Sequence, residues 1–196
     1  MDDDIELLDR LRAGDEQAFV ILVRRHHAAM LRLAASFVPS LAVAEEVVQD
    51  TWVGVLRGIS AFEGRSSVKT WLFRILVNRA RTAGVRERRV VTVGDAEPAV
   101  DPARFNRAGG WASPPQHWVE EADDRIQAAK IADRIRSAIE DLPPQQRQVV
   151  TLRDIDGLSS VEVCGILDIS AANQRVLLHR GRSRVRQVIE TEFGRF

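Results

Sequence analysis

The sequence predicts an all-α fold made of two small helical domains joined by an extended linker. Apolar residues recur at intervals of three and four from Ile5 to Leu76 and again after residue 120, the period of a helix with one buried face. The one candidate strand, Val90–Val93, is equally compatible with coil. Four of the seven prolines lie between Pro98 and Pro115 and interrupt the chain there. The expected parts are a first domain over residues 1–93, a linker over 94–122 and a second domain over 123–196.

The first domain is expected to contain four helices. The first ends near Gly14, and Asp15 caps the second, which runs towards Phe37. A proline and a serine then break the helix, and a third begins near Val43. The fourth starts after Ser66 and carries apolar residues at helical spacing.

The second domain is expected to end in a helix-turn-helix. A helix over residues 120–140 and another over 145–154 are separated by two prolines. Two short helices then follow between Gly157 and Arg186, joined by a tight turn at Leu167–Ile169. Asp168 tolerates the left-handed backbone of such a turn, and Ser170 can cap the second helix. The second helix of this motif enters the DNA major groove, so DNA is the leading candidate ligand.

Charge is distributed unevenly although the formal net charge is zero. Residues 61–93 carry eight Lys or Arg against two acidic residues, and residues 171–196 carry six against two. Local basic segments suit contact with phosphates, although a solvated helix face remains the alternative for each of them.

Several protein classes are disfavoured by what the sequence contains. Cys164 is the single cysteine, which excludes a disulfide framework, and the four histidines lack the spacing of metal ligands. No Ser/His/Asp set or phosphate-binding glycine loop suggests an enzyme, and we expect neither a cofactor nor a metal. No apolar run reaches membrane-spanning length, and the N-terminus is acidic, so a cytoplasmic protein is expected.

The segment Phe62–Asn78 combines aromatic and basic side chains, a composition that holds single-stranded nucleic acid by stacking and phosphate pairing. The alternative is that Trp71 and Phe73 are core residues of an ordinary amphipathic helix, which we favour for Trp71. The amide of Asn78 can pair with a base edge.

Three segments together resemble the extracytoplasmic-function (ECF) RNA polymerase sigma factors of the sigma-70 family. A-E-E-V-V-Q-D-T-W at Ala44–Trp52 resembles the core-polymerase-binding helix of that family. The segment F-E-G-R-S-S-V-K-T-W-L-F-R-I-L-V-N at Phe62–Asn78 resembles its promoter-melting segment. Residues Leu142–Ser170 resemble its region-4 domain up to the recognition helix.

The resemblance implies roles for particular residues. Docking on core RNA polymerase is implied for Glu46, Gln49, Asp50, Trp52 and Val53. Contact with the −10 element, including capture of a flipped base by Phe62 and Asn78, is implied for Phe62, Arg65, Lys69, Arg74, Asn78 and Arg81. Contact with the −35 element is implied for Arg153, Arg175, His179 and Arg180. Implied partners are core polymerase, promoter DNA and an anti-sigma factor, with a nucleoid location in the holoenzyme. The linker, which carries Trp111 and Trp118, would thread through the polymerase cleft, unless one tryptophan packs on the second domain.

The recognition helix departs from the common family pattern G-T-V-(K/R)-S-R-L-(H/F)-R-A-R. Asn173 and Gln174 replace a hydroxyl and an aliphatic residue, and Val176-Leu177 replaces Ser-Arg. Either amide can pair with adenine in two hydrogen bonds, which predicts a distinct −35 preference. The alternative function is a stand-alone helix-turn-helix regulator. Such a regulator would not need the polymerase-docking helix and melting segment that the Ala44–Asn78 block resembles.

Overall fold

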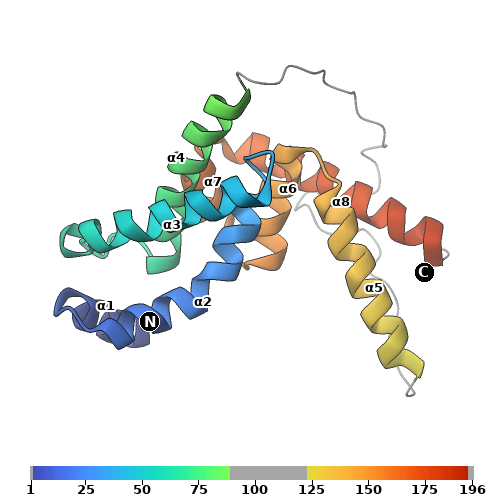
Figure 1. Cartoon of the computed structure of the whole chain (residues 1–196). Helices are drawn as coiled ribbons and strands as arrows, with labels where there is room; N and C mark the ends of the chain where they lie inside the picture. The colour runs from blue at the N-terminus through green and yellow to red at the C-terminus, as the bar shows by residue number, and fades with distance from the viewer. Residues whose placement is uncertain (1, 89–122, 194–196) are drawn as a thin grey trace. The chain divides into compact units, whose positions relative to one another are not determined.

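The computed structural model describes residues 2–88 and 123–193, and all regular secondary structure in those ranges is helical (Figure 1). The all-α fold class is confirmed. The expected linker, its two tryptophans and the candidate strand Val90–Val93 lie outside the described residues.

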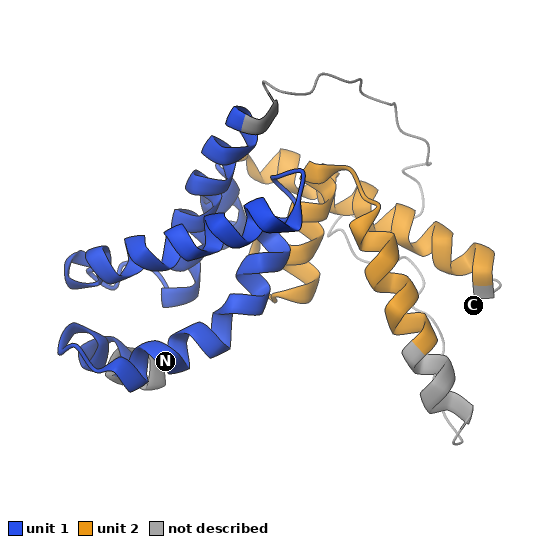
Figure 2. Cartoon of the chain, viewed as in Figure 1, with its two compact units in different colours: residues 1–93, 161–168 blue, residues 94–160, 169–196 orange. Residues whose placement is uncertain are grey.

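The chain divides into two compact units (Figure 2). Unit 1 consists of residues 1–93 with 161–168, and unit 2 consists of residues 94–160 with 169–196. The expected domain boundaries remain a prediction.

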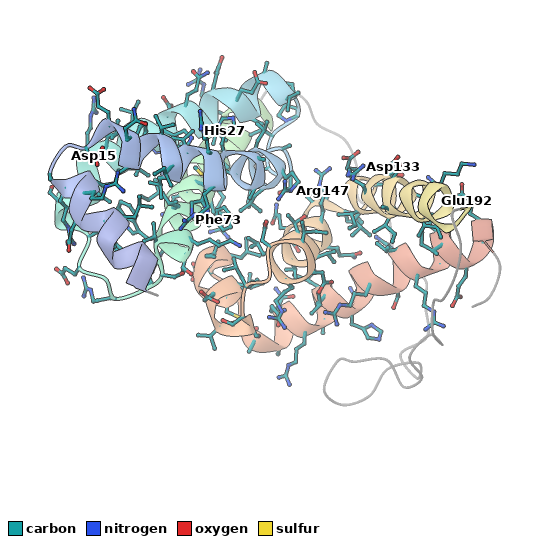
Figure 3. All side chains as sticks on the ribbon, turned by 90° about the horizontal axis from the view of Figure 1, so that it is seen from below. Asp15, His27, Phe73, Asp133, Arg147 and Glu192 are labelled. Atoms are coloured by element: carbon teal, nitrogen blue, oxygen red, sulfur yellow. The ribbon has the colours of Figure 1, made fainter. Side chains whose placement is uncertain are left out.

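Four helices form most of unit 1, and they pack because each presents an apolar face to the others. They are α1 (Asp2–Arg12), α2 (Glu16–Ala34), α3 (Leu41–Gly58) and α4 (Val68–Arg88), with a short 3₁₀ turn η1 (Ile59–Ala61) after α3. The helix α3 packs on both α2 and α4, and α1 packs on α2. Phe73 of α4 is the largest fully buried side chain of this core (Figure 3).

The start of α2 is fixed as the sequence predicts. The carboxylate of Asp15 accepts hydrogen bonds from the backbone N–H groups of Gln17 at 2.8 Å and Ala18 at 3.2 Å. Asp15 also pairs with the guanidinium of Arg10 at 2.8 Å, which lowers the pKa of the Asp15 carboxyl together with the backbone bonds (Figure 3). The cap therefore carries a negative charge at the helix N-terminus, where the helix dipole favours it.

Unit 2 is built on one long helix. α5 (Asp123–Glu140) and α6 (Pro144–Val150) both pack on α8 (Ala171–Phe193). Gly181 permits the close approach of α8, since a Cβ built there would lie 2.6 Å from Cγ2 of Val150. Partial burial of the Arg147 side chain, which α6 itself carries, lowers the pKa of its guanidinium.

One expected helix has a different form in the structure. The helix predicted over Gln145–Asp154 is an α-helix that begins at Pro144 and ends at Val150, followed by a π-helical turn η3 over Thr151–Ile155. Pro144 occupies the first turn, where its missing N–H costs nothing. Nothing in the residue pattern distinguishes a π turn from a continuing α-helix, so periodicity could not predict it.

The predicted order of helix, turn and helix is confirmed near the C-terminus. α7 (Ser160–Leu167) is followed by Asp168, whose φ is 51°. Asp168 is the single non-glycine residue of positive φ in residues 2–88 and 123–193. The hydroxyl of Ser170 then accepts a hydrogen bond from the backbone N–H of Asn173 at 3.1 Å, so Ser170 caps α8.

Candidate nucleic-acid interface

The first half of α8 has one buried and one exposed face. The buried face consists of Gln174, Leu177, Leu178 and Gly181. The other face carries Ala172, Asn173, Arg175, Val176 and Arg180, all exposed, with the half-buried ring of His179 among them. Because residues three and four apart share a helix face, these side chains form one continuous surface. That surface combines cations, an amide and an imidazole, the groups that pair with phosphates and base edges in the major groove.

Gln174 lies on the wrong side of the helix for the role expected of it. Its side chain is 1% exposed, and its amide oxygen accepts a hydrogen bond from the Ser160 hydroxyl at 2.9 Å. The expectation that this amide faces DNA is therefore wrong, because the amide fixes α8 to the preceding helix start instead. Of the two amides singled out from the sequence, Asn173 is the one on the exposed face.

Arg153 lies at the π turn η3 and is half-buried. Its Nη1 donates a hydrogen bond to the main-chain oxygen of Leu158 at 2.5 Å, which holds the segment that leads into α7. The next residue, Asp154, forms a two-point ion pair with Arg182 of α8, with contacts of 3.0 Å and 2.6 Å. That pair raises the pKa of Arg182 and ties α8 to η3. Arg153 and Arg182 therefore each have a partner within unit 2.

The second expected interface lies on α4 and the loop before it. Arg65, Arg74, Asn78 and Arg81 are exposed. Two of them already have a partner, because Arg65 pairs with Glu63 at 3.0 Å and the guanidinium of Arg81 donates to the main-chain oxygen of Leu167. Lys69 is half-buried, with its ammonium group 5.7 Å from the centre of the Phe73 ring.

Phe62 is 7% exposed, and its ring centre lies 4.8 Å from that of Trp71. Trp71 is half-buried and Phe73 is fully buried. Phe73 is therefore a core residue of an amphipathic helix, as the alternative interpretation of this segment expects, and Trp71 is one in part. Because Trp71 already covers one side of the Phe62 ring, the flipped-base role of Phe62 stays a prediction.

The third expected surface lies on α3. Glu46, Gln49, Asp50 and Val53 are all exposed, and their spacing of three, one and three places them on one helix face. Leu56 continues that face with 52% exposure, although the sequence analysis did not select it. The signal that could have found it is the same spacing, extended by three residues beyond Val53.

Trp52 does not belong to this surface. Its side chain is 7% exposed, its ring meets Phe19 edge-to-face at 5.8 Å, and its indole N–H donates to Nδ1 of His27 at 3.4 Å. The expectation that Trp52 lies at the edge of the docking face is wrong, since an indole with an apolar body and a satisfied N–H is a stable core group.

Two further observations concern residues 2–88 and 123–193. In these ranges no group of three or more His, Cys, Asp or Glu side chains is arranged to hold a metal ion. None of the helices described there is long and apolar enough to cross a membrane.

Comparison with protein families gives two matches in chain order. Residues 22–90 match the model for sigma-70 region 2, and residues 132–185 match the model for sigma-70 region 4. The first match covers most of α2, α3 and α4, and the second covers α6, α7 and the exposed part of α8. The two matches define a sigma-70-type transcription initiation factor.

Similar sequences and solved structures indicate which group of sigma-70-type factors the chain belongs to. The ECF RNA polymerase sigma-E factor of Salmonella typhimurium is 30% identical over 91% of this chain and 90% of its own length. The solved structure of CnrH with the cytosolic domain of CnrY is 25% identical, covers 96% of this chain and 98% of CnrH, and superimposes with a TM-score of 0.58. The sigma factor RpoE of Bartonella quintana, solved with the anti-sigma factor NepR, shares the fold at 22% identity and a TM-score of 0.52, over 87% of this chain and 98% of its own. The chain belongs to the ECF RNA polymerase sigma factors.

Proposed function

We propose that this sigma factor binds core RNA polymerase through α3 and directs initiation by reading a −35 element with α8 and a −10 element with α4. The observation that carries the proposal is the division of α8 into a buried face and a face of polar and basic side chains. Many surface helices show such a division, so the support lies in the content of the exposed face, which combines two arginines, an amide and an imidazole.

Reading of the −35 element is assigned to the exposed face of α8. Arg175 and Arg180 supply positive charge for phosphates or for the acceptor edge of guanine, and Asn173 supplies an amide for adenine. The −10 element and its melting are assigned to α4 and the preceding loop, where Arg65, Arg74 and Asn78 are exposed. Single-stranded DNA requires charge for its phosphates and partners for its unpaired bases, and these side chains offer both.

Docking on the polymerase is assigned to the exposed face of α3. Val53 and Leu56 are apolar and exposed, while Glu46 and Asp50 lie on the same face. Exposed aliphatic side chains among charges are typical of a surface that another protein covers.

The proposal includes a second protein partner. The relative CnrH was solved with the cytosolic domain of CnrY. We propose that an anti-sigma factor likewise holds this chain until a signal arrives. The chain would work in the cytoplasm at the nucleoid as part of the polymerase, and would contribute no catalytic group of its own.

Run-off transcription with purified core polymerase on genomic DNA tests the proposal. We expect defined start sites that depend on this protein and on the exposed cations of α8. Arg180→Ala should reduce specific initiation, whereas Arg136→Ala, which removes an exposed arginine of α5, should not. No start site above core polymerase alone would refute the proposal.

Polymerase binding separates this function from that of a stand-alone regulator. Leu56→Arg should weaken capture of core polymerase, while Val20→Arg, a matched change at an exposed site of α2, should leave it unchanged. A chain that binds duplex DNA specifically but never captures core polymerase would be an independent regulator.

A further inference from the structure

The exposed face of α8 has an apolar centre that the proposed function leaves unused. Val176 is 46% exposed, and Ala172 lies one turn before it on the same face. Asn173 and Arg180 lie on one side of this pair, and Arg175 lies on the other. An aliphatic side chain is thus surrounded by groups that bind nucleic acid.

The major groove offers few apolar partners to such a side chain. Base edges present hydrogen-bond donors and acceptors there, and the 5-methyl group of thymine is the apolar exception. A valine pressed against a polar base edge would displace water without replacing its hydrogen bonds, which costs affinity. A valine placed against a methyl group buries apolar surface on both partners instead.

We propose that Val176 contacts the 5-methyl group of a thymine and so specifies a T·A pair at one position of the −35 element. The inference rests on the proposed function, because it requires that the exposed face of α8 enters the major groove. A valine on a helix is restricted to one strongly preferred χ1 rotamer, so the contact has a fixed geometry. The neighbouring Arg175 and Arg180 hold the helix in register through phosphates or guanines, which fixes the base pair that Val176 meets.

The magnitude follows from the burial of one methyl group. Loss of that contact corresponds to about fourfold weaker binding, or about 0.8 kcal/mol for one buried methyl. The effect is small beside the loss of a two-point hydrogen bond to a base, but it is confined to one base pair and one strand.

The test uses the holoenzyme and thymine analogues. A library with a random −35 element is first selected with the wild-type holoenzyme. Each thymine of the selected element is then replaced by deoxyuridine, which pairs with adenine in the same way but lacks the methyl group, and holoenzyme affinity is measured. We expect one position at which deoxyuridine weakens wild-type binding about fourfold.

Variants assign that effect to the side chain. Val176→Ala should bind the thymine and deoxyuridine duplexes equally, since its contact is already lost, and its fold should persist because an exposed valine on a helix is replaced by a better helix former. Val85→Ala, a matched change at an exposed valine of α4, should keep the fourfold penalty.

Each outcome is decisive. A selected element without thymine, a wild-type holoenzyme indifferent to deoxyuridine at every position, or a Val176→Ala variant that keeps the penalty would overturn the inference while leaving the proposed function intact. If the holoenzyme selects no −35 sequence at all, the proposed reading by α8 itself is refuted, and this inference with it.

Discussion

The contact between α8 and α6 at Gly181 predicts that a single added methyl group there carries a packing cost. In Gly181→Ala, the new Cβ would lie 2.6 Å from Cγ2 of Val150, which is closer than carbon atoms approach in folded proteins. Val150 is buried and β-branched, so it cannot easily rotate away. The helices must shift apart, or Val150 must adopt a strained rotamer.

Gly165→Ala provides the matched control. Gly165 also lies in a helix within the residues matched by the region-4 model, but nothing within 4 Å would meet its Cβ. Alanine is favoured over glycine in a helix by about 1 kcal/mol, so Gly165→Ala should stabilise the protein by that amount. Gly181→Ala gains the same helix-propensity contribution to stability, but it loses about 1–3 kcal/mol of stability to overpacking. The difference between the two variants therefore isolates the overpacking cost, about 1–3 kcal/mol.

Urea unfolding of the full chain, followed by circular dichroism, measures both variants. In the Val150→Ala background, which removes Cγ2, we expect Gly181→Ala to cost less than it does alone, giving a favourable coupling of about 1 kcal/mol. The reasoning is refuted if Gly181→Ala is as stable as Gly165→Ala, or if the cost persists in the Val150→Ala background.

Three further predictions concern other parts of the chain. The lowered pKa of Asp15 means that its charge stabilises the fold above the unfolded carboxyl pKa of about 3.9, and that this stabilisation is lost as the pH falls through the folded pKa. The stability difference between wild type and Asp15→Asn, which keeps a capping group, should thus be constant near neutral pH and shrink in acid unfolding series; a difference that grows in acid would contradict this. Phe73→Ala should cost about 3–5 kcal/mol in thermal unfolding because the ring is fully buried, whereas Val85→Ala at an exposed site should change stability by less than about 0.5 kcal/mol. Arg175→Ala should reduce the slope of log affinity against log salt for promoter binding by about 0.9 if it neutralises one phosphate, and an unchanged slope would exclude that contact.

Local features of the fold could be predicted because short-range chemistry decides them. The cap at Asp15 and the cap at Ser170 each depend on one side chain and a nearby N–H group, and both form. The left-handed backbone at Asp168 follows from a turn too short for other conformations. These features need no knowledge of distant residues.

The candidate surfaces were predicted less well, since exposure depends on partners far along the chain. Gln174 is polar, which suggested a ligand role, but its side chain is buried and its amide oxygen accepts a hydrogen bond from Ser160. Trp52 lies beside the docking residues in sequence, but Phe19 and His27 of another helix enclose it. A single sequence contains no record of which polar or aromatic side chain finds such a partner.

The two faces of α8 allow the proposed DNA-facing side chains to change without loss of the fold. The positions that hold the helix in its domain, such as Gln174 and Leu178, are separate from the positions exposed to a ligand, such as Asn173 and Val176. Substitutions at exposed sites usually change stability by less than about 0.5 kcal/mol, so they escape the selection that preserves folding. The set of genes under control of such a factor can therefore drift, or be redesigned, by exchange of a few side chains while the scaffold stays the same.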